Sequence, residues 1–124
     1  MRPPVKDWLK KADGDMEAAA RLIRGKKPLY DHVCFHSEQA AEKYLKAFLE
    51  NTGRPIPRTH DLIALVNAAK PDLDFLLLKR DELEMLTGCA VTFRYPGDEA
   101  AKEDALLALK AAENIAAVVR PKIK

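Results

Sequence analysis

The chain has 124 residues, of which 48% are hydrophobic and 32% are charged, a composition typical of one folded domain rather than a disordered segment. Its 21 lysines and arginines nearly balance its 19 aspartates and glutamates, so the net charge of +2 does not favour a general nucleic-acid-binding or membrane-surface protein. No apolar run approaches the roughly 20 residues that cross a bilayer, and the first residues lack the apolar core of a signal peptide. We therefore expect a single domain over residues 1–124 in the cytoplasm.

The first half of the chain predicts two long amphipathic helices. Apolar residues recur at helical spacing over 4–24, and Gly25 ends that segment. The second helix is predicted over 31–51, and the side chains on one of its faces are mostly small and apolar. Its other side carries a mixed polar stripe, made of His32, His36, Gln39, Lys43, Lys46 and Glu50. Such a helix is on the order of 30 Å long, so this stripe would follow a whole side of the molecule.

Three further helices are predicted in the second half. Thr59 is the expected N-cap of a helix over 60–70, and a fifth helix should begin near Asp98 and end at 120–122. Between them, a fourth helix over 74–91 should be capped by Asp74 and should bury Phe75, Leu78, Met85, Leu86 and Cys89. Because the connections are short, the sequence predicts an all-α, up-and-down bundle of four to five antiparallel helices.

The cysteines and the first two histidines give no prediction of a metal or a cofactor. Cys34 and Cys89 are far apart among apolar neighbours, so we expect buried, reduced thiols. His32 and His36 have the i, i+4 spacing of two zinc ligands, but no third ligand and no H-E-x-x-H motif accompanies them. We interpret them as members of the polar stripe.

Several cations are candidates for a phosphate or nucleotide site. If the fold brought them together, four cations could bind a phosphate without a glycine-rich loop; they are Lys43, Lys46, Arg58 and Arg94. Alternatively, the two lysines pair with glutamates at helical spacing on a solvated face.

Two arginines have alternative interpretations. Arg94, just before Tyr95 and a proline corner, either contacts a ligand or pairs with a carboxylate of the second helix. Arg54 and His60 have the spacing of the arginine–histidine pair of some helical ribonucleases. Two prolines lie between them, however, so we interpret that spacing as coincidental and expect His60 to fasten its loop to the bundle.

Four short segments occur in an order that resembles the HEPN domain family (higher eukaryotes and prokaryotes nucleotide-binding). They are residues 8–16, with Trp8 and then ADGDM, residues 35–47 (FHSEQAAEKYLKA), residues 59–62 (THDL) and residues 94–96 (RYP). The resemblance extends roughly from Val5 to Val119. It implies a bundle of four or five helices that is commonly dimeric. It also implies that the protein functions together with a minimal nucleotidyltransferase, as one half of a toxin–antitoxin or nucleotide-handling pair.

The sequence departs from the family pattern at two positions, and the second departure argues against the ribonuclease branch of the family. Glu38 stands where the common pattern has a glutamine. The ribonuclease branch carries an arginine followed four to six residues later by a histidine, just before the last helix. Here Arg94 is followed by YPGDEA, which contains no histidine. General acid–base catalysis supplies about 10²–10⁴-fold, so the resemblance implies a phosphate contact by Arg94 but no ribonuclease site.

The preferred hypothesis is therefore a non-catalytic subunit that binds a nucleotide or substrate for a minimal nucleotidyltransferase partner. Its expected ligand-binding residues are Arg94, Tyr95, Lys43, Lys46, His36, Gln39, Arg58 and His60, with no catalytic residue. Two alternatives remain open. One is an RNA-cleaving toxin that depends on His60 or His36, and the other is a structural, dimerising subunit without a ligand.

Overall fold

The computed structural model describes the backbone of residues 1–124 and every side chain except that of Arg94. The described backbone is helical and confirms the predicted all-α bundle. Its α-helices are α1 (Pro3–Arg24), α2 (Tyr30–Thr52), α3 (Leu62–Ala68), α4 (Arg80–Gly88) and α5 (Lys102–Val119). Three 3₁₀ turns accompany them, namely η1 (Asp74–Lys79), η2 (Thr92–Arg94) and η3 (Arg120–Lys122). None of the described helices is both long and apolar enough to span a membrane.

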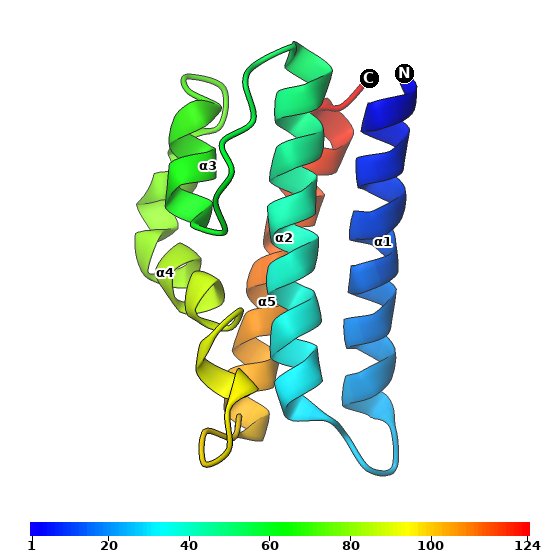
Figure 1. Cartoon of the computed structure of the whole chain (residues 1–124), viewed down its shortest axis with the longest axis vertical. Helices are drawn as coiled ribbons and strands as arrows, with labels where there is room; N and C mark the ends of the chain where they lie inside the picture. The colour runs from blue at the N-terminus through cyan, green and yellow to red at the C-terminus, as the bar shows by residue number, and fades with distance from the viewer.

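Helix α2 is the centre of the bundle (Figure 1). It contacts each of the other four α-helices. α1 lies antiparallel beside it along most of its length, α5 packs on a second side, and α3 and α4 cover a third. The two chain termini lie at the same end of the bundle. Helix α2 is therefore the neighbour that the other four α-helices share.

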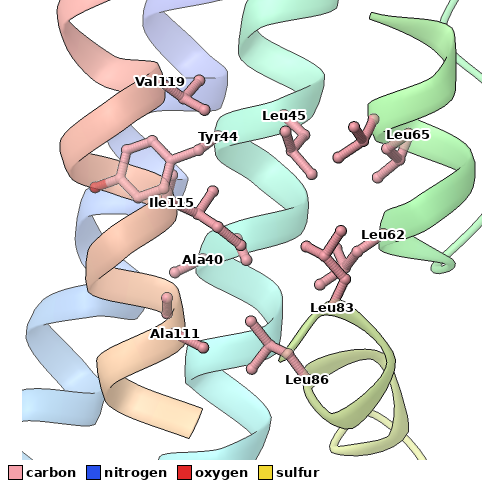
Figure 2. Close-up of a cluster of buried hydrophobic side chains, with 14 of the residues drawn as sticks. Ala40, Tyr44, Leu45, Leu62, Leu65, Leu83, Leu86, Ala111, Ile115 and Val119 are labelled. Carbon is pink, nitrogen blue, oxygen red and sulfur yellow. The ribbon is translucent and has the colours of Figure 1, made fainter. Parts of the chain in front are cut away.

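The composition of α2 explains this central place. Twelve of its 23 residues are buried, which is more than a single apolar stripe of a surface helix would supply. On one side, Ala40 and Tyr44 face α5, where Ala111, Ile115 and Val119 point toward them (Figure 2). On the other side, Leu45 faces the leucines of α3 and α4, which are Leu62, Leu65, Leu83 and Leu86. The alanines allow neighbouring helices to approach α2, and the leucines fill the wider space.

The predicted start of the third helix is wrong by two residues. Asp61, rather than Thr59, is the N-cap, because its carboxylate accepts a hydrogen bond from the backbone N–H of Ile63 at 3.0 Å. The Thr59 hydroxyl instead accepts a bond from the Asp61 N–H, also at 3.0 Å, and forms a turn just before the helix. The helix itself is short and ends at Ala68.

The predicted single helix over 74–91 is also wrong, because the segment divides into η1 and α4. A 3₁₀ turn has three residues per turn rather than 3.6, so the α-helical periodicity does not describe which side chains of η1 face inward. Phe75 is 43% exposed and Leu78 is 89% exposed, although both were expected to be buried. Asp74 makes no side-chain cap bond. In α4 the prediction succeeds for Leu86, which is buried, as is Cys89 directly after the helix, whereas Met85 is only partly buried.

The fifth helix begins at Lys102, four residues later than expected. Two contacts explain the delay. The backbone N–H of Ala100 donates to the Asp31 carboxylate of α2 at 2.6 Å, and that of Ala101 donates to Asp104 at 2.8 Å. The preceding segment is thus tied to α2 in an extended form, and Gly97 has a φ of 93°, outside the right-handed helical region.

Two glycine substitutions test these backbone assignments. Gly14 lies inside α1, and a Cβ atom added there would meet no atom within 4 Å, so Gly14→Ala should raise the free energy of unfolding by about 1 kcal/mol. Gly53 ends α2 with a φ of 74°, so Gly53→Ala should lower it by about 1 kcal/mol. Urea unfolding of both variants measures the signs, and a change of the same sign in both would contradict the assignment.

Candidate functional site

The polar stripe of α2 is organised around two carboxylates. The first is Asp15 of α1, whose oxygens lie 2.9 Å from Nδ1 of His36 and 2.6 Å from Nζ of Lys43. The Asp15 side chain is largely buried between α1 and α2. Lys43 and His36 therefore hold α1 against α2, and the cationic charge of Lys43 is neutralised where it lies.

The second carboxylate is Glu42 of α2 itself, whose side chain is only 5% exposed. One of its oxygens lies 2.6 Å from Nδ1 of His60, and the other accepts a hydrogen bond from Nζ of Lys46 at 3.3 Å. The Lys46 ammonium group also lies 5.7 Å from the ring centroid of Trp8. His60 thus fastens the loop after α2 to the bundle, as the sequence led us to expect.

Four of the predicted anion-binding residues are consequently divided into two pairs, with His36 and Lys43 around Asp15 and Lys46 and His60 around Glu42. Lys46 pairs with a glutamate of its own helix, whereas Lys43 pairs with a residue of another helix. Arg58 and Tyr95 are exposed, and neither forms an ion pair or hydrogen bond within the described part of the chain. The expected contact by Arg94 concerns a side chain that lies outside the described residues.

Glu38, one helical turn before Glu42, is fully buried. Its Oε1 accepts a hydrogen bond from the Gln39 side chain at 2.7 Å, while its Oε2 has no partner among the described groups. Burial, and secondly the negative charge of Glu42, raise the pKa of Glu38 to about 8. Glu38 is therefore mostly protonated at neutral pH, and it adds little charge to the stripe.

A third polar contact joins three elements on the α1 side of the bundle. Asp13 of α1 accepts hydrogen bonds from the Tyr44 hydroxyl of α2 at 2.5 Å and from the Arg120 guanidinium of η3 at 2.7 Å. The bond from Arg120 holds the pKa of Asp13 below its usual range. Burial, and then the bond to Asp13, raise the pKa of the Tyr44 hydroxyl. Asp13 and Asp15 were not identified from the sequence, although two acids with one residue between them inside an amphipathic helix signal a partner on another element.

The cleft that best fits a ligand lies at the N-terminal end of α2. It has a volume of about 480 Å³, within the range of small-molecule sites, and it opens between α2 and the chain around η2. Its walls are Asp31, His32, Phe35, His36, Cys89 and Phe93. We call it the α2–η2 cleft. Of the residues expected to bind a ligand, it includes His36, and Arg94 and Tyr95 directly follow its wall residue Phe93 in sequence.

The floor of the α2–η2 cleft contains a thiol. Cys89 lines the cleft, and Cys34 and Cys89 are both free and buried. The neighbouring Cys34 thiol, and secondly burial, raise the pKa of Cys89. Among the described side chains, no three His, Cys, Asp or Glu residues are grouped so that they would hold a metal ion.

A second groove is larger, at about 600 Å³, but it is a poorer candidate. It lies between α1 and η3, and its walls include Asp13 and Arg120. These two charges already bind each other, so neither is available to a ligand without breaking the contact among α1, α2 and η3.

Comparison with known proteins assigns the family. The sequence matches the family described as "HEPN domain" over residues 5–122, which is nearly the whole chain. The protein belongs to the HEPN domain family. A solved structure of ST0689, an archaeal HEPN homologue, is 27% identical with a TM-score of 0.73, and each chain is covered completely. TT1696 from Thermus thermophilus is 25% identical with a TM-score of 0.84, covering 98% of this chain and 99% of that one. No curated protein matches the sequence.

The positions of the three histidines matter for this HEPN domain. Each lies N-terminal to Arg94, so none falls between Arg94 and α5, where the ribonuclease branch has its histidine. His32 and His36 line the α2–η2 cleft, and His60 lies at the loop before α3. Arg94 ends η2, and no histidine follows it before α5.

The buried acid predicts a pH dependence of stability. Folding raises the pKa of Glu38 from about 4.5 to about 8, so the folded protein binds the proton more tightly than the unfolded chain. The stabilising effect is complete below about pH 4.5 and is lost as the pH rises toward about 8. Glu38→Gln keeps a neutral side chain at all pH values. Relative to wild type, its free energy of unfolding should increase between about pH 5 and pH 8, on the order of 1–3 kcal/mol.

The control for this experiment is Glu84→Gln, since Glu84 is an exposed glutamate of α4. Chemical unfolding across the pH range measures all three proteins. An identical pH profile for wild type and Glu38→Gln would show that the Glu38 carboxyl is ionised in the folded protein.

Proposed function

We propose that this HEPN domain is a nucleotide-binding subunit that serves a minimal nucleotidyltransferase partner and has no catalytic activity of its own. The observation that carries the proposal is the α2–η2 cleft. Its wall residue Phe93 is followed in sequence by Arg94, which matches the arginine of the family motif. The middle of the polar stripe is a weaker candidate, because Asp15 and Glu42 already neutralise its lysines.

The walls of the cleft suit a nucleotide. Phe35 and Phe93 offer aromatic faces on which a base can stack, an interaction worth about 1–3 kcal/mol. Asp31 offers a carboxylate that can accept hydrogen bonds from ribose hydroxyls. His32 is exposed at the rim, and the cationic Arg94 follows Phe93 in sequence, so the phosphates would be directed toward that corner.

The absence of activity is inferred from the missing proton-transfer group. An arginine alone can position a phosphate and stabilise its charge, but cleavage of RNA also needs a group that moves a proton at the reacting oxygen. The segment from Tyr95 to Ala101 supplies no histidine for that role.

We place the partner surface at the same corner of the molecule. Tyr95 and Val91 are both exposed, and each lies two residues from the cleft residue Phe93 in sequence, so they offer apolar contact to another protein. A minimal nucleotidyltransferase bound there would cover the cleft opening and share its nucleotide. The family resemblance further suggests a homodimer as the working unit.

A thermal-shift titration with ATP, GTP, CTP and UTP, each with and without Mg²⁺, tests the proposal. At 100 times its dissociation constant, a ligand should stabilise the protein by about 2.7 kcal/mol, which corresponds to a shift of several degrees. His32→Ala and Arg94→Ala should each reduce the shift, because His32 lines the cleft and Arg94 directly follows the wall residue Phe93 in sequence.

Arg80→Ala is the matched control, since Arg80 is an exposed arginine of α4 whose surface ion pair adds little stability. It should show the wild-type shift. The proposal is wrong if no nucleotide shifts the midpoint, or if the shift persists in both cleft variants. Conversion of the nucleotide, or cleavage of added RNA, by the isolated protein would contradict the absence of activity.

A further inference from the structure

His60 differs from the other two histidines in its surroundings. Its side chain is 74% exposed, yet its Nδ1 lies 2.6 Å from an oxygen of the buried Glu42. The His36 ring, which contacts Asp15, is only 29% exposed. The exposed His32 makes no hydrogen bond to a carboxylate within the described part of the chain. His60 therefore combines an open face with a fixed inner nitrogen.

The carboxylate determines which nitrogen of His60 is free. An ionised carboxylate only accepts hydrogen bonds, so the neutral imidazole must carry its proton on Nδ1 and donate it to Glu42. The lone pair is then on Nε2, on the opposite edge of the ring, which faces the solvent. A buried carboxylate that orients an imidazole in this way also increases the basicity of the outer nitrogen.

The surroundings hold the Glu42 carboxylate and the His60 ring in place. The second oxygen of Glu42 accepts a hydrogen bond from Lys46 at 3.3 Å. Glu38 is mostly protonated, so it places little negative charge next to Glu42. The loop is held on both sides of His60, because Thr59 accepts the Asp61 N–H and Asp61 caps α3. The carboxylate–imidazole pair is thus preorganised on a rigid turn.

The shape of the surface indicates what can reach this nitrogen. His60 does not line the α2–η2 cleft or the groove beside α1, and its ring projects from the loop rather than into a hollow. A small substrate would have few walls to hold it there. The reactant must therefore be a donor that approaches an open histidine. Lys46 shares the Glu42 carboxylate with His60, and the exposed Arg58 lies two residues earlier in the loop.

We propose that Nε2 of His60 is a nucleophile that accepts a phosphoryl group from a phosphorylated donor with a good leaving group, such as an acyl phosphate or a phosphoramidate. The Nε2 lone pair attacks phosphorus and forms the N–P bond. The bond from phosphorus to the leaving group breaks, and its electron pair departs with that group. The proton stays on Nδ1, and the Glu42 carboxylate balances the positive charge that develops on the ring. This site is separate from the cleft and does not depend on nucleotide binding.

Phosphorylation of the full-length protein by potassium phosphoramidate near neutral pH tests the inference. In this reaction the P–N bond breaks and ammonia leaves. Mass spectrometry under non-acidic conditions locates and times the modification. We expect His60 to be modified about tenfold faster than His32, the exposed histidine without a carboxylate partner, which is the size of effect that one charge-assisted hydrogen bond can provide. This comparison is internal to the wild-type protein, so it does not depend on the folding of a variant.

Two variants extend the experiment. Glu42→Gln keeps the shape but removes the charge, and it should slow modification of His60 to the rate of His32. Arg58→Ala should also slow it, whereas Arg80→Ala should not. Equal rates for His60 and His32 in the wild-type protein would overturn the inference, as would an unchanged rate in a folded Glu42→Gln variant.

Discussion

The rest of the structure depends on one constraint, the burial of a central helix that carries charges. α2 has neighbours on three sides, and removing a charge from water is costly unless a partner is supplied. Each ionisable side chain in the buried part of α2 is either paired with an opposite charge or protonated. Lys43 meets Asp15 of α1, Glu42 meets both Lys46 and His60, and Glu38 takes up a proton. The helix can therefore be central without an unpaired charge in the core.

These solutions have consequences for function. Since Asp15 and Glu42 bind the cations along the middle of α2, that part of the stripe ties α1 and the loop before α3 to the core rather than offering positive charge to a ligand. The remaining opportunity lies at the N-terminal end of the helix. There α2 meets the irregular chain between α4 and α5, and this HEPN domain has a cleft with aromatic walls. Arg94 directly follows the wall residue Phe93 in sequence, and our proposal assigns recognition of an anion to it.

The extent to which sequence anticipates this arrangement differs between elements. The long helices were predicted to within one residue, because α1 and α2 each maintain helical periodicity over more than 20 residues. The start of α5 could not be inferred, since it is set by a bond from Ala100 to Asp31, 69 positions away. Phe75 and Leu78 were misplaced because η1 has a 3₁₀ period. The stripe itself was recognised, but its pairings depend on Asp15 and His60, which reach α2 only through the tertiary fold.

We propose that a nucleotide binds at the N-terminal end of α2 and not along the middle of the stripe. Amide chemical shifts of the isotopically labelled protein, followed during titration with a nucleoside triphosphate, test it most directly. Our account predicts that the changes concentrate at residues 31–36 and 89–95. Changes centred on residues 39–46, or the absence of any change at saturating nucleotide, would contradict it.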